Sequence, residues 1–197
     1  MCGALNDEGF ATCIRCGSPL RAGTPIARPA RALTTQAAPP ARAVVILGVL
    51  CSLVFALQIL LALKLRSTLP ILGAGSRLEA VRSGALEVDL LLFLAEPFRL
   101  LSAVFVHFGL IHFGMNMMGF VWLGKIAERL VGPARTIITF VVTGIAGFAA
   151  TLTLAVLTGT ANGTLTAGAS GGILGVMGLV VGVLARRRDP RWKPFVF

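Results

Sequence analysis

Two long stretches without a charged residue constrain this chain more than any other feature. Residues 44–63 are a run of 20 uncharged residues, and residues 136–185 are a run of 50. About 20 apolar residues span the hydrocarbon core of a bilayer, so the first run fits one membrane-spanning helix and the second fits two. Charged residues make up 13% of the chain, roughly half of the ~25% found in soluble domains. These features exclude a disordered chain, a secreted disulfide scaffold and an ordinary soluble enzyme. They predict an all-α membrane protein.

We expect four membrane spans, at about 44–63, 108–124, 136–157 and 168–185. Turn-forming residues at 158–164 (TGTANGT) divide the longer run into two. The segment 64–99 is mixed in charge, and its apolar stretch Leu90–Ala95 is too short to span, which favours an interfacial or re-entrant element. Between the second and third spans we expect a charged turn, which carries Lys125, Glu128, Arg129 and Arg135.

The distribution of basic residues predicts the orientation. With the N-terminus inside, the inner segments carry 13 Lys and Arg and the outer segments carry five. The positive-inside rule therefore predicts a multi-pass protein of the cell membrane, of bacterial type, with a cytoplasmic N-terminus. The net charge of +10 does not indicate nucleic-acid binding, because the basic residues form small clusters between uncharged runs without interleaved aromatics.

The N-terminal region has a different character. Residues 1–20 contain a CxxCG motif at Cys13–Gly17, and Cys2-Gly3 repeats its Cys-Gly ending. Such motifs present thiolates to zinc. We therefore expect an incomplete zinc-ribbon-like segment in which Cys2, Cys13 and Cys16 hold a structural zinc, with a fourth ligand upstream of Met1; incidental cysteines are the alternative. Residues 21–43 are rich in Pro, Ala and Arg and predict a flexible linker before the membrane domain at 44–197.

Polar side chains within the spans form a second pattern. His112 and Asn116 lie four residues apart and so share one helix face, with His107 just before them. Ser170 begins the fourth span within Gly168-Ala-Ser-Gly171, where the helix dipole is positive and small neighbours admit another backbone. Buried polar groups in a membrane are costly and usually functional. His and Asn side chains near a serine can donate hydrogen bonds to a developing oxyanion. A serine in a glycine-rich helix is, taken alone, more typical of helix packing.

In this order the motifs resemble those of the rhomboid intramembrane serine proteases, over about residues 96–188. The resemblance is carried by EPFRLLSAVFVHFGLIHFGMNM at 96–117, by Gly124, Glu128 and Gly132 at four-residue spacing, and by G-x-S-G at 168–171. It implies a helical bundle of six spans, of which four are present, with the segment 64–99 as a membrane-embedded loop.

The resemblance also implies the roles of single residues. Ser170 would be the nucleophile, with His112, Asn116 and the backbone N–H of Ser170 as the oxyanion hole. His107 would be structural, as would Gly168, Gly171, Gly124, Glu128 and Gly132, and Glu128 would pair with Arg129 at the cytoplasmic end. Arg99 follows Phe98, where a Trp-Arg pair is commoner in the family.

One departure concerns the general base. The family uses a histidine on the sixth helix, whereas this chain has two histidines, both near the second span. A serine without an adjacent base is a weak nucleophile. We therefore expect a fragment, inactive alone, of an endopeptidase that cleaves transmembrane segments of other proteins in the bilayer without a catalytic cofactor. A four-span pseudoprotease that binds membrane clients is the main alternative. A channel or transporter is disfavoured, because the spans lack a carboxylate or basic pathway residue.

Overall fold

The computed structural model describes residues 12–13, 15–19, 41–67 and 75–196. The chain divides into two compact units, Met1–Pro40 and Ala41–Phe197. We describe each by itself. Most of the predicted linker, together with Cys2, lies outside the described residues. Its predicted end at residue 43 is two residues late, because the first helix begins at Arg42.

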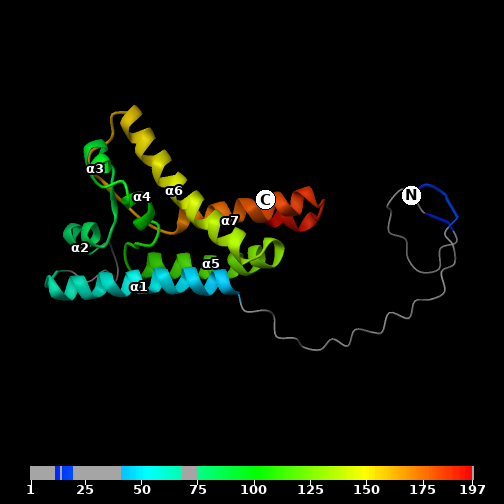
Figure 1. Ribbon diagram of the computed structural model, residues 1–197, viewed down its shortest axis with the longest axis horizontal. Coiled ribbons are helices and arrows are strands. Elements are labelled where there is room, and N and C mark those ends of the chain that lie inside the picture. Colours follow the sequence, from blue (N-terminus) through cyan, green and yellow to red (C-terminus); the bar gives the residue numbers. More distant parts are fainter. Residues whose placement is uncertain (1–11, 14, 20–40, 68–74, 197) are drawn as a thin grey trace. The chain divides into compact units, whose positions relative to one another are not determined.

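Four long helices form the larger unit (Figure 1). They are α1 (Arg42–Lys64), α5 (Leu110–Val131), α6 (Pro133–Leu157) and α7 (Ser170–Arg186). Each corresponds to one of the four predicted helices, and α6 ends where the turn-forming segment 158–164 begins.

Helix α5 continues seven residues beyond its predicted end at Gly124, so the predicted charged turn is wrong. Lys125, Glu128 and Arg129 lie on its last two turns, because such side chains are good helix formers. The chain reverses direction at Gly132 alone, where φ is +86°. Pro133 then starts α6 at a position where its missing N–H costs no hydrogen bond.

Helices α1 and α6 are long and apolar enough to cross a membrane, while α7 is apolar but has 17 residues. That length is about 25 Å, against roughly 30 Å for a bilayer core. On α1, one stripe that includes Leu47, Cys51 and Phe55 is buried, and apolar side chains cover the opposite side. A helix that is apolar on its outward face suits a hydrocarbon solvent. The buried Cys51 behaves as the predicted small hydrophobe.

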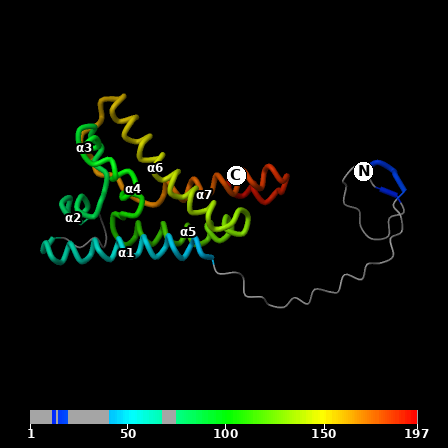
Figure 2. Tube along the Cα trace, in the orientation of Figure 1, coloured from blue at the N-terminus to red at the C-terminus, as the bar shows by residue number. Residues whose placement is uncertain are grey.

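Short elements connect α1 to α5 and lie at one end of the long helices (Figure 2). They are α2 (Arg77–Arg82), β1 (Leu86–Glu87), α3 (Leu90–Ala95) and α4 (Arg99–Ser102). Helix α3 coincides with the short apolar stretch singled out in the sequence, and the Asp89 side chain caps its first turn. Strand β1 pairs antiparallel with β2 (Leu165–Thr166), with Leu86 opposite Thr166. This pairing ties the connecting segment to the residues just before α7.

The core lies where α5, α6 and α7 meet. Phe120 and Phe140 are fully buried, with ring centroids 5.0 Å apart, and Val176 and Val180 pack in the same cluster. Small residues let α7 approach α6 closely, since a Cβ added at Gly172 would lie 2.6 Å from the Phe140 carbonyl oxygen. A 3₁₀ helix, η1 (Pro190–Phe195), follows α7.

Candidate active site

Ser170 is the first residue of α7, and its side chain is exposed. Its Oγ makes no hydrogen bond to any residue in the described part of the chain. The segment before Ser170 is held in place by the Gly168 N–H, which donates to the Ala103 carbonyl at 2.9 Å. The hydroxyl therefore lies at a helix N-terminus, is exposed, and has no hydrogen-bond partner among the described residues.

Gly168 brings Ser170 and His112 together. Its φ is +135°, in the region that favours glycine. A Cβ added there would lie 2.8 Å from His112 Cε1, 3.0 Å from His112 Nε2 and 3.9 Å from Ser170 Oγ. The imidazole and the hydroxyl thus lie within 4 Å of one point, which a larger residue would fill. The small residue in the G-x-S-G motif makes room for the His112 ring.

The hydrogen bonding of His112 decides which ring nitrogen carries a proton. The backbone N–H of Phe108 donates to His112 Nδ1 at 3.2 Å. An acceptor at Nδ1 leaves the proton of a neutral imidazole on Nε2. His112 Nε2 lies 3.0 Å, and Ser170 Oγ 3.9 Å, from the position that a Gly168 Cβ would take. The ring therefore presents a donor to the space next to the hydroxyl, which suits stabilisation of an oxyanion and does not suit a base that takes the serine proton.

Asn116 lies one turn further along α5 and is buried. Its Nδ2 donates to the His112 carbonyl at 2.9 Å, which uses one of its two N–H groups. This bond holds the amide on the face of α5 that carries His112. The shared face that the sequence spacing predicts is therefore present.

His107 is completely buried and lies beside the site without reaching its open side. Its ring is 5.4 Å from that of His112 and meets Phe113 edge-on, and its Nδ1 is 3.0 Å from the Phe105 carbonyl. The main chain of His107 is clamped by Gln58 of α1, whose amide accepts from the His107 N–H at 3.0 Å and donates to its carbonyl at 2.9 Å. This residue orders the chain that leads into α5.

Two buried polar residues around His107 were missed in the sequence. Gln58 Nε2 also donates to Glu79 at 3.2 Å, and Glu79 is completely buried. Burial raises the pKa of the Glu79 carboxyl above its ordinary value, although hydrogen bonds from Gln58 and Ser83 oppose the rise. Gln58 could have been found, because an amide inside a 20-residue apolar run is costly unless it has partners. No comparable signal marks Glu79, which lies in a segment of mixed charge.

Arg99 braces the segment between α1 and α5. Its guanidinium donates to the carbonyls of Val81 at 2.7 Å and Ala85 at 3.0 Å, and it pairs with Glu96. These contacts lie away from Ser170. Arg99 therefore holds the connecting segment in shape and does not line the site.

Gly124, Glu128 and Gly132 act at the opposite end of α5. A Cβ at Gly124 would lie 2.8 Å from Val44 Cγ2, so this glycine permits the close approach of α1. Glu128 Oε2 accepts from the Ala43 N–H at 3.0 Å and so caps the start of α1. The predicted pair of Glu128 with Arg129 is absent from the ion pairs of the described residues. Arg129 is exposed instead.

Gly171 belongs to the helix contact. A Cβ there would meet Gly144 Cα at 3.6 Å, which is ordinary van der Waals contact.

The structure therefore gathers Ser170, Gly168, His112 and Asn116 into one place. It leaves Gly171, Arg99 and the Gly124–Gly132 motif as supports of the fold.

The described part of the N-terminal unit is a tight turn around the CxxCG motif. The Cys13 N–H donates to the Ser18 carbonyl and the Gly17 N–H to the Cys13 carbonyl, at 2.8 and 2.9 Å, with Gly17 at φ +68°. No group of three or more His, Cys, Asp or Glu in the described ranges is placed to hold a metal. Because Cys2 lies outside these ranges, the zinc site stays a prediction.

Comparisons with known proteins identify the family of the chain. The sequence profile of the Rhomboid domain matches residues 94–197, just over half of the chain. RHOMBOID-like protein 1 of Arabidopsis thaliana is 28% identical over 116 residues, which cover 58% of this chain. The matched part is 28% of that plant protein's length. No solved structure matches the chain.

Proposed function

This chain belongs to the rhomboid family, a family of helical membrane proteins, and from that premise we propose that Ser170 is the nucleophile of an intramembrane serine endopeptidase. The substrates are transmembrane segments of other membrane proteins. Ser170 attacks the scissile carbonyl, while His112 Nε2, an Asn116 N–H and the backbone N–H of Ser170 stabilise the oxyanion. No cofactor takes part.

One observation carries this proposal. The position that a Gly168 Cβ would take lies 3.0 Å from His112 Nε2 and 3.9 Å from Ser170 Oγ, and the Phe108 N–H keeps the proton of the imidazole on Nε2. A preorganised donor of this kind contributes ~10²–10³ in rate. A serine that only packs helices has no need for an oriented imidazole or for an exposed hydroxyl.

The proton of Ser170 needs an acceptor that is neither of this chain's two histidines. His107 is buried, and His112 is held as a donor. We propose that another group takes this proton. The same observation favours a second candidate function, in which the protein binds transmembrane clients and does not cut them.

The bilayer placement belongs to the proposal as well. We place all four long helices across the membrane, with Ser170 toward the outer side and the N-terminus in the cytoplasm. The predicted zinc at Cys2, Cys13 and Cys16 would be structural and would take no part in this chemistry.

The test uses the natural gene product, reconstituted in vesicles with a fluorogenic transmembrane reporter whose cut site holds small, helix-breaking residues. Ser170→Ala should abolish cleavage, whereas Ser52→Ala, on the outward face of α1, should cleave like the unchanged protein. His112→Ala and Asn116→Ala should each slow cleavage ~10²–10³-fold, the effect of one lost oxyanion donor.

Unchanged cleavage by Ser170→Ala would contradict the proposal that Ser170 is the nucleophile. If no form cleaves, and the reporter still forms photo-crosslinks to α5 and α7, the client-binding function is supported in its place.

A further inference from the structure

Positive charge gathers at the end of the membrane unit opposite Ser170. The contact of Glu128 with Ala43 and the hydrogen bond from Arg187 to the Leu130 carbonyl, 3.5 Å long, bring together the start of α1 and the ends of α5 and α7. Nine basic residues lie on the described elements at this end, namely Arg42, Lys125, Arg129, Arg135, Arg186, Arg187, Arg188, Arg191 and Lys193. The acidic residues on the same elements are Glu128 and Asp189.

Both carboxylates have partners other than the basic side chains at the end of α5. Glu128 is engaged by the Ala43 N–H. Asp189 is engaged by Arg191, whose Nε donates to both of its oxygens at 2.9 Å and holds the pKa of Asp189 down to about 2. In the described part of the chain, no carboxylate lies within ion-pair distance of Lys125 or Arg129. Both side chains are exposed.

Lys125 and Arg129 form the polar end of an open groove along α5. The groove has a volume of about 630 Å³ and is lined by Met117, Met118, Val121, Trp122, Lys125 and Arg129, together with Ile126. We call it the α5 groove. It is apolar toward the middle of the helix and cationic toward the helix end.

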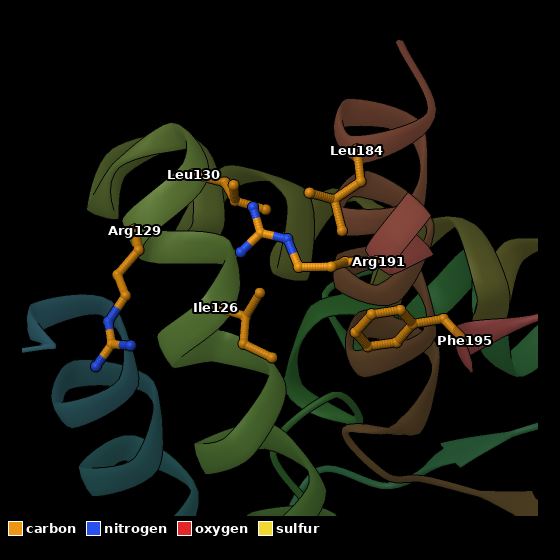
Figure 3. A pocket seen from close by; sticks show the side chains of 6 residues that line it. All are labelled: Ile126, Arg129, Leu130, Leu184, Arg191 and Phe195. Atoms are coloured by element: carbon orange, nitrogen blue, oxygen red, sulfur yellow. The ribbon is translucent and has the colours of Figure 1, made fainter. Parts of the chain in front are cut away.

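A second pocket of about 320 Å³ adjoins the α5 groove and shares Ile126 and Arg129 with it. Figure 3 shows the Arg191 side chain reaching from η1 across this pocket, with Phe195 and Leu184 on the side of α7 and Ile126 on α5. The ring of Trp122, which lines the α5 groove, lies in a tilted contact with Phe195 of the second pocket, with centroids 5.5 Å apart.

The dimensions match one leaflet of a bilayer. From Lys125 back to Met117 the helix rises ~12 Å, which fits within the ~15 Å of a half core. Trp122 lies near the charged end, where tryptophans of membrane proteins concentrate at the interface. A cationic end next to an apolar channel in one leaflet matches a ligand with a negative headgroup and a hydrocarbon chain.

We propose that the α5 groove binds an anionic phospholipid, with the phosphate on Lys125 and Arg129 and an acyl chain against Met117, Met118, Val121 and Trp122. Basic clusters next to membrane helices attract anionic headgroups, by about fivefold in affinity for each basic residue near the surface. The site lies at the other end of the unit from Ser170 and is independent of proteolysis.

The test uses the tryptophan in the groove as the probe. With Trp192→Phe in the full chain, Trp122 is the remaining tryptophan of the two. The protein is reconstituted in phosphatidylcholine vesicles that contain equal fractions of phosphatidylglycerol brominated on its acyl chains or of brominated phosphatidylcholine. We expect stronger quenching of Trp122 by the brominated phosphatidylglycerol, and a preference that weakens as salt is raised.

Lys125→Gln combined with Arg129→Gln should lower this preference about 25-fold. Quenching by brominated phosphatidylcholine should stay unchanged and so report an intact groove. The matched control is Arg135→Gln with Arg186→Gln, which removes the same charge from the same end outside the groove and should keep the preference.

Three results would overturn the proposal. The first is equal quenching by the two brominated lipids. The second is an equal loss of preference in the control, which would indicate a diffuse surface potential. The third is displacement of the brominated phosphatidylglycerol by millimolar inorganic phosphate, which would indicate a phosphate site without a lipid chain.

Discussion

At Gly168 the backbone has φ +135°, and the place of a Cβ is taken by the His112 ring. Gly168→Ala should therefore displace the imidazole and strain the turn, at a cost of ~1–3 kcal/mol in the free energy of unfolding. It should also slow reporter cleavage by the natural gene product at least as much as His112→Ala does. Both effects can be measured, by unfolding in detergent and by the vesicle assay.

Gly171→Ala is the matched control, because an added Cβ there finds contacts no closer than 3.6 Å. It should change stability little and preserve cleavage. Equal effects of the two substitutions would mean that the Gly168 space does not position His112.

Glu79 gives the protein a pH dependence of known sign. Its pKa in the folded state is raised by burial. Its contribution to stability is therefore complete below the ordinary carboxyl pKa and is lost as the pH rises through the raised value. Glu79→Gln keeps an acceptor for the Gln58 amide and removes the titration. The unfolding temperature of the variant should exceed that of the unchanged protein at neutral pH, and the difference should shrink as the pH falls.

Thermal unfolding of both forms between about pH 4 and pH 8 checks this expectation. The effects of other titrating groups cancel in the difference between the two proteins. A difference that does not change with pH would show that the Glu79 carboxyl is not titrating in the folded state.

At the scale of elements, the contact of α1 with α5 depends on Gly124. A Cβ there would lie 2.8 Å from Val44 Cγ2, and a β-branched side chain has little freedom to move aside. Gly124→Ala should destabilise the protein by ~1–3 kcal/mol through overpacking. The measurement is chemical or thermal unfolding of the reconstituted or detergent-solubilised chain.

The same helix provides the control. An added Cβ at Gly119 would meet nothing within 4 Å, so Gly119→Ala should be neutral or stabilise by up to ~1 kcal/mol, because alanine favours helix. Destabilisation of the same size at Gly119 would attribute the effect to α5 in general and not to its contact with α1.

The sequence predicts the long helices well and the short elements poorly, for physical reasons. Long apolar runs specify helices, because every backbone polar group must be satisfied within the segment. The end of α5 is harder to predict, since Lys125, Glu128 and Arg129 are good helix formers, whereas charged residues are also typical of the loops between membrane spans. The two-residue strands β1 and β2 have no periodicity of their own. They exist because the fold places Leu86 and Thr166 side by side.

The two ends of the long helices differ in their balance of basic and acidic residues. One end carries Ser170, His112 and the connecting segment, where five basic and four acidic residues are nearly balanced. The other end carries nine basic residues and two acidic ones. The charge count predicts this asymmetry without a structure. The sequence spacing also predicts that His112 and Asn116 share a face, but the orientation of the His112 ring depends on the Phe108 N–H and on Gly168, which only three-dimensional contacts reveal.

The pairing of β1 with β2 has a consequence for the order of events during synthesis. Leu86 and Thr166 are far apart in the chain, and the Ala103 carbonyl likewise gains its donor, the Gly168 N–H, only after residue 168 has been synthesised. Contacts of such sequence separation form late, since the loop between them must first close. While α6 is being inserted, the residues of β2 have not yet been synthesised. The edge of β1 therefore stays exposed to chaperones or to other chains. A nascent chain that ends before β2 therefore leaves β1 without its partner strand, and Ser170, which follows β2, is not yet present.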